Sequence, residues 1–145
     1  MKSIFKSFVA VAAIAGIFTV SSCTKTCDPG YEGSDCKTEW RTKFVGTYQF
    51  ADVCPSGNYT GTATISISAS DVVKVLITNY AGLGGTATLT GTLTESNKIE
   101  IASGSAAGFT TTNATGTLNS NIINWTYTIN DGSATETCTS TWTKQ

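Results

Sequence analysis

The chain of 145 residues contains no histidine. This absence excludes the Ser-His-Asp and Cys-His arrangements of nucleophilic catalysis, and it removes the usual zinc ligands. Basic residues are also scarce, since nine lysines and arginines stand against ten acidic residues. No basic stripe is present for a nucleic-acid backbone, and no glycine-rich loop precedes a helix to hold phosphate. We therefore expect no nucleic-acid partner, no metal, no cofactor and no catalytic residues.

Long apolar runs are missing everywhere except near the start of the chain. Residues 8–20 are almost wholly apolar or small, and they follow Lys2 and Lys6 and precede Ser21 and Ser22. This order is typical of a secretory signal peptide. The run of about 13 residues is shorter than the ~20 that a membrane-spanning helix needs. We predict a signal peptide over residues 1–22, with a retained transmembrane anchor as the alternative.

The residues that end this segment, Val20-Ser21-Ser22-Cys23, resemble the lipobox of bacterial lipoproteins. The resemblance implies cleavage before Cys23 and acylation of its sulfur by diacylglycerol and usually of its amine, which includes palmitate-type chains. The five cysteines support it, because an exported chain with an odd number leaves one without an internal partner. The alternative is an ordinary signal peptide with a thiol near the cut. Lipidation predicts a membrane anchor at the outer membrane of a bacterial cell envelope, facing the periplasm or the surface.

Residues 23–43 are expected to form a lipid-anchored linker. Within it, residues 27–36 read CDPGYEGSDC and resemble the last disulfide loop of EGF-like modules, which implies a Cys27–Cys36 bond. The four earlier cysteines of a full module have no counterparts here. The charged segment 37–43 is expected to be linker, able to form one helical turn, with Trp40 packed onto the next domain.

Residues 44–145 alternate between apolar residues and threonine, which is the pattern of half-buried antiparallel strands. The apolar members predicted to share one face include Tyr59, Ala63, Ile65, Ile67, Val73, Val75, Ile77, Ala87, Leu89, Leu93, Ile99, Ile101, Ile123, Trp125, Tyr127 and Ile129. Turn-forming segments separate the runs, and the sharpest is Asn130-Asp131-Gly132. The pattern predicts an all-β, up-and-down antiparallel meander of about eight strands, closed as a barrel, with a β-sandwich as the alternative.

Cys54 and Cys138 favour the barrel. One ends the first expected strand and the other lies in the last, and a disulfide requires Cα atoms within about 7 Å. A bond between them brings the terminal strands together, as closure requires. If the two cysteines face each other in an antiparallel pair, Phe50 faces Trp142.

The start of this domain, Lys43-Phe44-Val45-Gly46-Thr47-Tyr48, is similar to the first-strand motif of the lipocalin and fatty-acid-binding group. The alternative is a strand with a bulge glycine and a core aromatic residue. The whole layout also resembles small lipoproteins of the Bacteroidetes, a group without established activity. These resemblances imply a lipocalin-like β-domain on a lipid anchor.

Two functions follow. The first is a non-enzymatic interaction or structural module, tethered in the envelope, that meets a protein or glycan. The alternative is a lipocalin-like binder of a small apolar ligand. The candidate ligand-binding residues are the large side chains expected inside the barrel: Tyr48, Phe50, Trp125, Tyr127 and Trp142.

Carboxylates are the remaining candidates for catalytic residues, because a glycosidase needs only two carboxyl groups for catalysis. The six in question are Asp52, Asp71, Glu95, Glu100, Asp131 and Glu136. We expect most of them at turns or on the polar face, where they cap turns and confer solubility. Glu136 is the exception, since it shares a face with Cys138 and Trp142. Two orientations are open for it: inward near a barrel mouth, or solvated beside the turn.

Overall fold

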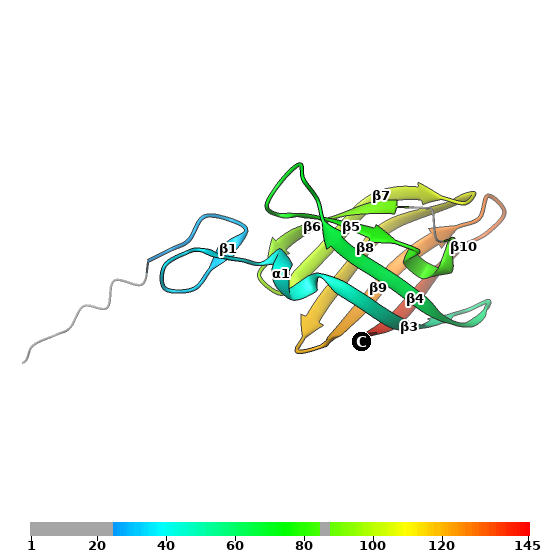
Figure 1. The fold of residues 1–145 in the computed structure, drawn as a ribbon. Coiled ribbons are helices and arrows are strands. Elements are labelled where there is room, and N and C mark those ends of the chain that lie inside the picture. The colour runs from blue at the N-terminus through cyan, green and yellow to red at the C-terminus, as the bar shows by residue number, and fades with distance from the viewer. Residues whose placement is uncertain (1–24, 85–87) are drawn as a thin grey trace, which may run out of the picture.

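A computed structural model describes residues 25–84 and 88–145 (Figure 1). The predicted signal peptide and the predicted lipidation at Cys23 lie outside the described residues. Within the part described, a small N-terminal segment with its own two-stranded sheet precedes a closed barrel. No helix among these residues is long and apolar enough to cross a membrane.

The barrel has eight strands, each paired antiparallel with its neighbours in the sequence. They are β3 (Gly46–Cys54), β4 (Gly57–Ile67), β5 (Lys74–Thr78), β6 (Thr88–Glu95), β7 (Lys98–Ala106), β8 (Phe109–Asn119), β9 (Ile122–Asn130) and β10 (Thr135–Lys144). Closure comes from β10, which pairs with β9 on one side and with β3 on the other. The predicted up-and-down barrel is confirmed, and the β-sandwich alternative is excluded.

A disulfide bond between Cys54 and Cys138 joins the first and last strands of the barrel. Along the same strand pair, Phe50 lies directly opposite Trp142, which is the predicted register. The two cysteines thus fix both the pairing of β3 with β10 and the side of the sheet that faces inward.

Apolar side chains fill the barrel, and threonines cover its outer face, because alternate residues of a strand point to opposite sides. Two residues predicted to face the core with the others are half exposed: Tyr59 at 48% and Ile67 at 49%. Each lies toward an end of β4, where the barrel wall no longer encloses the side chain. Their predicted burial was wrong for that reason.

The N-terminal segment is held by the predicted Cys27–Cys36 disulfide. Its strands β1 (Tyr31–Glu32) and β2 (Thr38–Glu39) are followed by one helical turn, α1 (Arg41–Phe44). The predicted linker 37–43 is therefore ordered as part of a strand and a turn of helix. Trp40 packs against the barrel core as expected, and Lys43 forms an ion pair with Glu32 at 2.9 Å.

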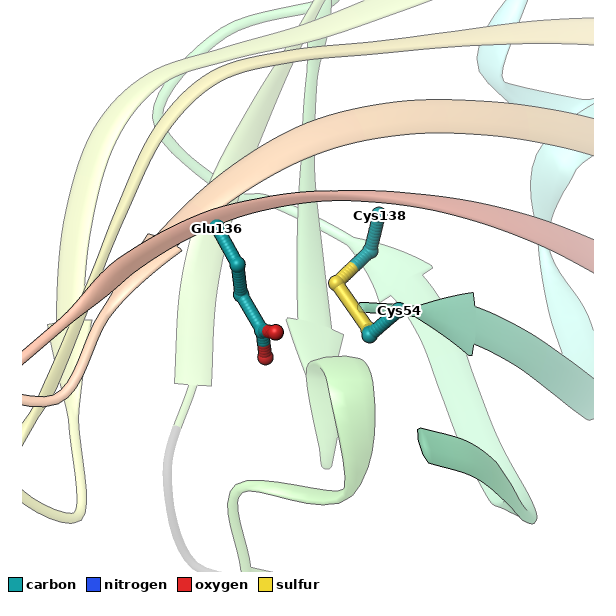
Figure 2. A group of neighbouring side chains, drawn as sticks. All are labelled: Cys54, Glu136 and Cys138. Atoms are coloured by element: carbon teal, nitrogen blue, oxygen red, sulfur yellow. A yellow bond between two sulfur atoms is a disulfide. The ribbon is translucent and has the colours of Figure 1, made fainter. Parts of the chain in front are cut away.

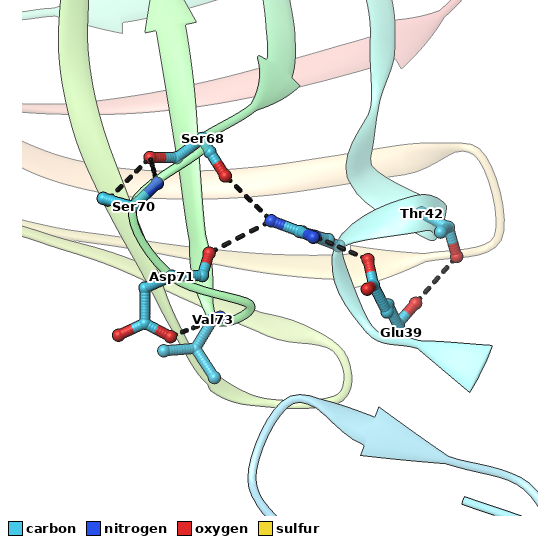
Figure 3. Close-up of polar contacts among 7 residues, drawn as sticks. Glu39, Thr42, Ser68, Ser70, Asp71 and Val73 are labelled. Atoms are coloured by element: carbon cyan, nitrogen blue, oxygen red, sulfur yellow. Dashed lines mark hydrogen bonds and ion pairs between the residues drawn. The ribbon is translucent and has the colours of Figure 1, made fainter. Parts of the chain in front are cut away.

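Arg41 attaches this segment to the turn between β4 and β5. Figure 3 labels the groups that accept its hydrogen bonds, Glu39 in the segment and Ser68 and Asp71 in the turn. Its guanidinium donates hydrogen bonds to the backbone carbonyls of Ser68 at 2.8 Å and Asp71 at 3.1 Å. It also pairs with Glu39 at 2.6 Å. The side chain of Arg41 therefore joins β2, α1 and the β4–β5 turn.

A short 3₁₀ helix, η1 (Tyr80–Gly82), follows β5 and directs Tyr80 into the barrel. The Tyr80 ring packs edge-on against Trp125 and Tyr127, with 5.3 Å between ring centroids in both cases. The centroid of the same ring lies 5.7 Å from that of Trp142. Tyr80 therefore closes the barrel centre from one end.

Candidate ligand-binding site at the barrel mouth

The two ends of the barrel differ. The end that we call the stub end carries α1 and the β4–β5 turn, to which the N-terminal segment is attached. The opposite end, which we call the mouth, is formed by η1 and by the β3–β4, β7–β8 and β9–β10 turns. A cavity of about 410 Å³ opens at the mouth. This volume lies in the range of small-molecule sites.

The cavity is confined to the mouth because aromatic side chains fill the centre. The ring centroids of Trp125 and Trp142 are 5.5 Å apart. The rings of Tyr48 and Phe50 pack on Trp142 with centroid distances of 5.9 and 6.1 Å. Of the five predicted ligand-binding residues, Tyr127 lines the cavity. The other four, Tyr48, Phe50, Trp125 and Trp142, belong to the packed core beneath it.

Asp52 forms part of the cavity lining although only 2% of the residue is exposed. It lies on β3, with Phe50 and Cys54 on the same inward face. One carboxylate oxygen, Oδ1, is buried without any hydrogen-bond partner. Burial raises the pKa of Asp52, and the neighbouring hydroxyl groups of Ser140 and Tyr127 oppose the rise. The prediction that Asp52 lies at a turn or on the polar face was wrong.

Glu136 also lines the cavity, which is the inward one of the two orientations that its sequence position leaves open. Its carboxylate accepts hydrogen bonds from the backbone N–H of Ser56 at 3.0 Å and from the Ser56 hydroxyl at 2.7 Å. These bonds tie the β3–β4 turn to β10. Figure 2 shows the Glu136 side chain beside the Cys54–Cys138 disulfide. Glu136 therefore shapes the mouth as well as contributing negative charge to it.

Glu136 and the two sulfurs of Cys54 and Cys138 lie within 4.8 Å of one another. Such a group would suit a metal if the sulfurs were thiolates, because the thiolate is the form that binds metals. Both sulfurs are joined in the disulfide. The group is therefore a structural clasp and not a metal site while that bond is intact.

Asp131 is the third carboxylate at the mouth, in the predicted β9–β10 turn. Its Oδ1 accepts hydrogen bonds from the backbone N–H groups of Ser133 and Ala134 at 2.8 and 2.7 Å. These bonds lower the pKa of Asp131 and hold it in the charged form. The turn prediction for this residue is confirmed.

The other three candidate carboxylates lie away from the cavity. Asp71 accepts a hydrogen bond from the Val73 N–H within the β4–β5 turn at the stub end. Glu95 pairs with Lys98 at 2.8 Å, and Glu100 accepts a hydrogen bond from Thr94. These contacts fit the predicted roles in turns and on the polar face.

The lining of the cavity combines acid with apolar surface. Asp52, Asp131 and Glu136 supply carboxylates, while Tyr59, Phe109 and Tyr127 supply aromatic rings. Among the residues that the structure describes, no lysine or arginine lines the cavity. Burial raises the pKa of Tyr127, and the neighbouring Asp52 raises it further, so that this phenol stays neutral.

Sequence analysis missed two residues that shape the site. Tyr80, whose ring packs on Tyr127 of the lining and on the core, lies in a segment of turn residues with no alternation to indicate its burial. Ser140, which lies opposite Asp52 on β10, is inward by its alternation with Cys138 and Trp142. The same signal was available for Asp52, because it alternates with Phe50.

The molecule is thus a closed, eight-stranded, up-and-down antiparallel barrel with a floored cavity at one end. No family model matches the chain, and no curated protein matches its sequence. It is similar in structure to a "putative outer membrane protein" from Bacteroides fragilis, with a TM-score of 0.43 and 20% identity over 73% of this chain. The alignment covers 52% of that protein, so the chain spans about half its length. The function is therefore inferred from the residues of the mouth.

Proposed function

We propose that this protein is a non-enzymatic, lipid-tethered binding module of the cell envelope that takes a small ligand into its barrel mouth. The carrying observation is the cavity of about 410 Å³ above the plugged core, with the buried Asp52 carboxylate in its lining. Lipocalin-like barrels use the same general arrangement, an end of the barrel left open above packed side chains.

Binding is favoured over catalysis by the side chains at hand. The chain has no histidine, and four of its five cysteines are joined in disulfides. The Glu136 carboxylate is held by Ser56, and the phenol of Tyr127 stays neutral. The lining is suited to recognising a ligand by shape and charge.

The mixed lining also alters the expected ligand. A purely apolar molecule would leave the Asp52 oxygen buried and unpaired, which is costly. A ligand with a polar or charged group beside an apolar part would satisfy it. The proposed ligand is therefore amphipathic and not purely apolar.

A second candidate function, docking of a protein or glycan, is favoured by the exposed apolar side chains beside the mouth. Val53 and Tyr59 are 58% and 48% exposed, on the hairpin of β3 and β4. A macromolecular partner that inserts one group into the cavity would contact both residues.

Ligand capture is tested by purifying the protein in mild detergent from its own envelope and identifying bound small molecules by mass spectrometry. The Ala134→Trp variant fills the rim of the cavity, and Thr137→Trp places the same bulk on the outer face of β10 as a control. We expect a small molecule with the natural protein and with Thr137→Trp, and its loss with Ala134→Trp. Equal retention by all three proteins, or no retained molecule, would contradict the proposal.

The tether is tested on the same preparation. Intact-mass measurement is expected to show a chain that begins at Cys23 and carries diacylglycerol and an acyl chain. The Cys23→Ser variant is expected to leave the membrane fraction or to keep residues 1–22. A free Cys23 thiol in the natural protein would overturn the lipoprotein assignment.

A further inference from the structure

We propose that the mouth selects a ligand that carries a protonated nitrogen, an organic ammonium ion on an apolar body. This inference rests on the proposed binding function and adds the chemical class of the ligand. It depends on the distribution of charge over the whole barrel and on the buried carboxylate oxygen that has no partner.

Basic residues are confined to one end of the barrel, whereas acidic residues occur at both. The five basic residues from α1 onward all lie at or near the stub end: Arg41, Lys43, Lys74, Lys98 and Lys144. The mouth carries Asp52, Asp131 and Glu136, and its lining in residues 25–84 and 88–145 includes no basic residue. A concave site of one sign concentrates ligands of the opposite sign, so the mouth attracts cations.

Asp52 offers the attracted cation a specific binding group. Its Oδ1 is an acceptor that is buried within the lining and lacks a donor from the protein. An ammonium N–H supplies both the missing donor and the opposing charge, and such charge-assisted hydrogen bonds are among the stronger ones. Glu136 and Asp131 already accept hydrogen bonds from the protein, so their contribution is mainly to the field of the mouth.

The rest of the lining favours an organic cation over a metal ion. Calcium takes six to eight oxygen ligands, whereas much of this lining is carbon, with the rings of Tyr59, Phe109 and Tyr127 and the side chain of Ile129. Aromatic faces attract ammonium groups and also cover an apolar body. The expected ligand is therefore an amine of a size that fits about 410 Å³.

The test is calorimetric titration of the purified protein with three matched probes. Phenethylammonium carries the charge, 2-phenylethanol is its neutral analogue, and phenylacetate is an anionic counterpart. We expect the ammonium to bind at least about tenfold more tightly than the alcohol, because charged hydrogen bonds contribute more than neutral ones. Phenylacetate is expected not to bind.

Variants locate the effect. Asp52→Asn keeps the shape of the side chain and is expected to abolish the preference for ammonium over alcohol. Asp71→Asn makes the same change at the stub end and is expected to leave the preference intact. Circular dichroism of both variants confirms the fold.

Several results would overturn the inference. Equal binding of ammonium and alcohol, tighter binding of phenylacetate, an unchanged preference in Asp52→Asn, or displacement of the ammonium by millimolar calcium would each do so. Binding of the alcohol or the anion in the mouth would leave the proposed binding function standing. Failure of all three probes would reject the ammonium ligand, while retention of a native ligand is decided separately by mass spectrometry.

Discussion

At the scale of single residues, the most consequential side chain is that of Asp52. A carboxylate with a buried, unpaired oxygen is disfavoured in its ionised form, because burial removes water without replacing all of its hydrogen bonds. The groups near it are Tyr59 on β4, Tyr80 on η1, Tyr127 on β9 and Ser140 on β10, with none of them basic. Glu136 lines the same cavity. A cationic ligand that binds Asp52 would offset the cost of this buried charge.

This argument predicts a pH dependence of stability. The pKa of Asp52 is raised above 3.8 in the folded protein, so the folded state keeps a proton that the unfolded chain has already lost. The unfolding free energy of the natural protein, relative to Asp52→Asn, is therefore expected to fall as the pH rises from below 3.8 through the folded-state pKa. Urea denaturation at a series of pH values measures this difference.

Asp131 provides the control, because its hydrogen bonds lower the pKa of its carboxylate. Relative to Asp131→Asn, the natural protein is expected to gain stability as the pH rises through the folded-state pKa toward 3.8. If both comparisons change in the same direction, the burial argument for Asp52 is wrong.

At the scale of elements, η1 decides how much of the barrel is open. Its residues Ala81 and Gly82 line the cavity, while the ring of Tyr80 packs on Trp125 and Trp142 in the core. The hydroxyl of Tyr80 is buried without a hydrogen-bond partner, so the ring contributes packing while the oxygen contributes a cost.

Two substitutions separate these contributions. Tyr80→Ala is expected to lower the unfolding free energy by about 3–5 kcal/mol, the cost of removing a large buried ring. Tyr80→Phe keeps the ring and removes the unpaired hydroxyl, so it is expected to be neutral or slightly stabilising. Chemical denaturation of both variants provides the measurement, and a large loss in Tyr80→Phe would show that the hydroxyl has a partner.

The elements also show what the sequence can predict. Alternation with period two assigns each strand an inward and an outward face, and the pair Cys54 and Cys138 sets the register of β3 against β10. The strands and the closure were predictable for these reasons. The cavity was not, because its floor depends on the path of the β5–β6 connection, which carries Tyr80 inward without any periodic pattern.

The predicted exposure of Asp52 was wrong for a different reason. Its alternation with Phe50 indicates the inside of the barrel, whereas its charge indicates the outside. We gave the charge more weight, as burial statistics favour. The structure places Asp52 inside, as its alternation indicates. Local rules of this kind tend to be broken at functional sites, which agrees with the proposed role of the mouth.

At the scale of the whole molecule, the even number of strands places both ends of the barrel chain together. β3 begins at the stub end and β10 ends there, where the backbone N–H of Gln145 donates a hydrogen bond to the Thr47 carbonyl. The mouth therefore lies at the end opposite the N-terminal segment. If Cys23 is lipidated as proposed, the ligand site faces away from the membrane that holds the protein.

The two disulfides are expected to contribute unequally to the stability of the whole molecule. Replacing Cys54 and Cys138 together by alanine removes a link across 84 residues and is expected to cost about 4–5 kcal/mol by the chain-entropy relation. Replacing Cys27 and Cys36, which are 9 residues apart, is expected to cost less and to loosen only the N-terminal segment. Urea unfolding followed by barrel tryptophan fluorescence distinguishes the two, and equal losses would contradict this account.

The Cys54–Cys138 bond has a further consequence for cleavage of the chain. All of the barrel's hairpin connections lie between these two residues, so the bond makes this part of the protein a covalent ring. A protease that cuts any one turn opens the ring but releases no fragment. The nicked barrel remains a single molecule with its strands still paired, and only reduction separates the pieces.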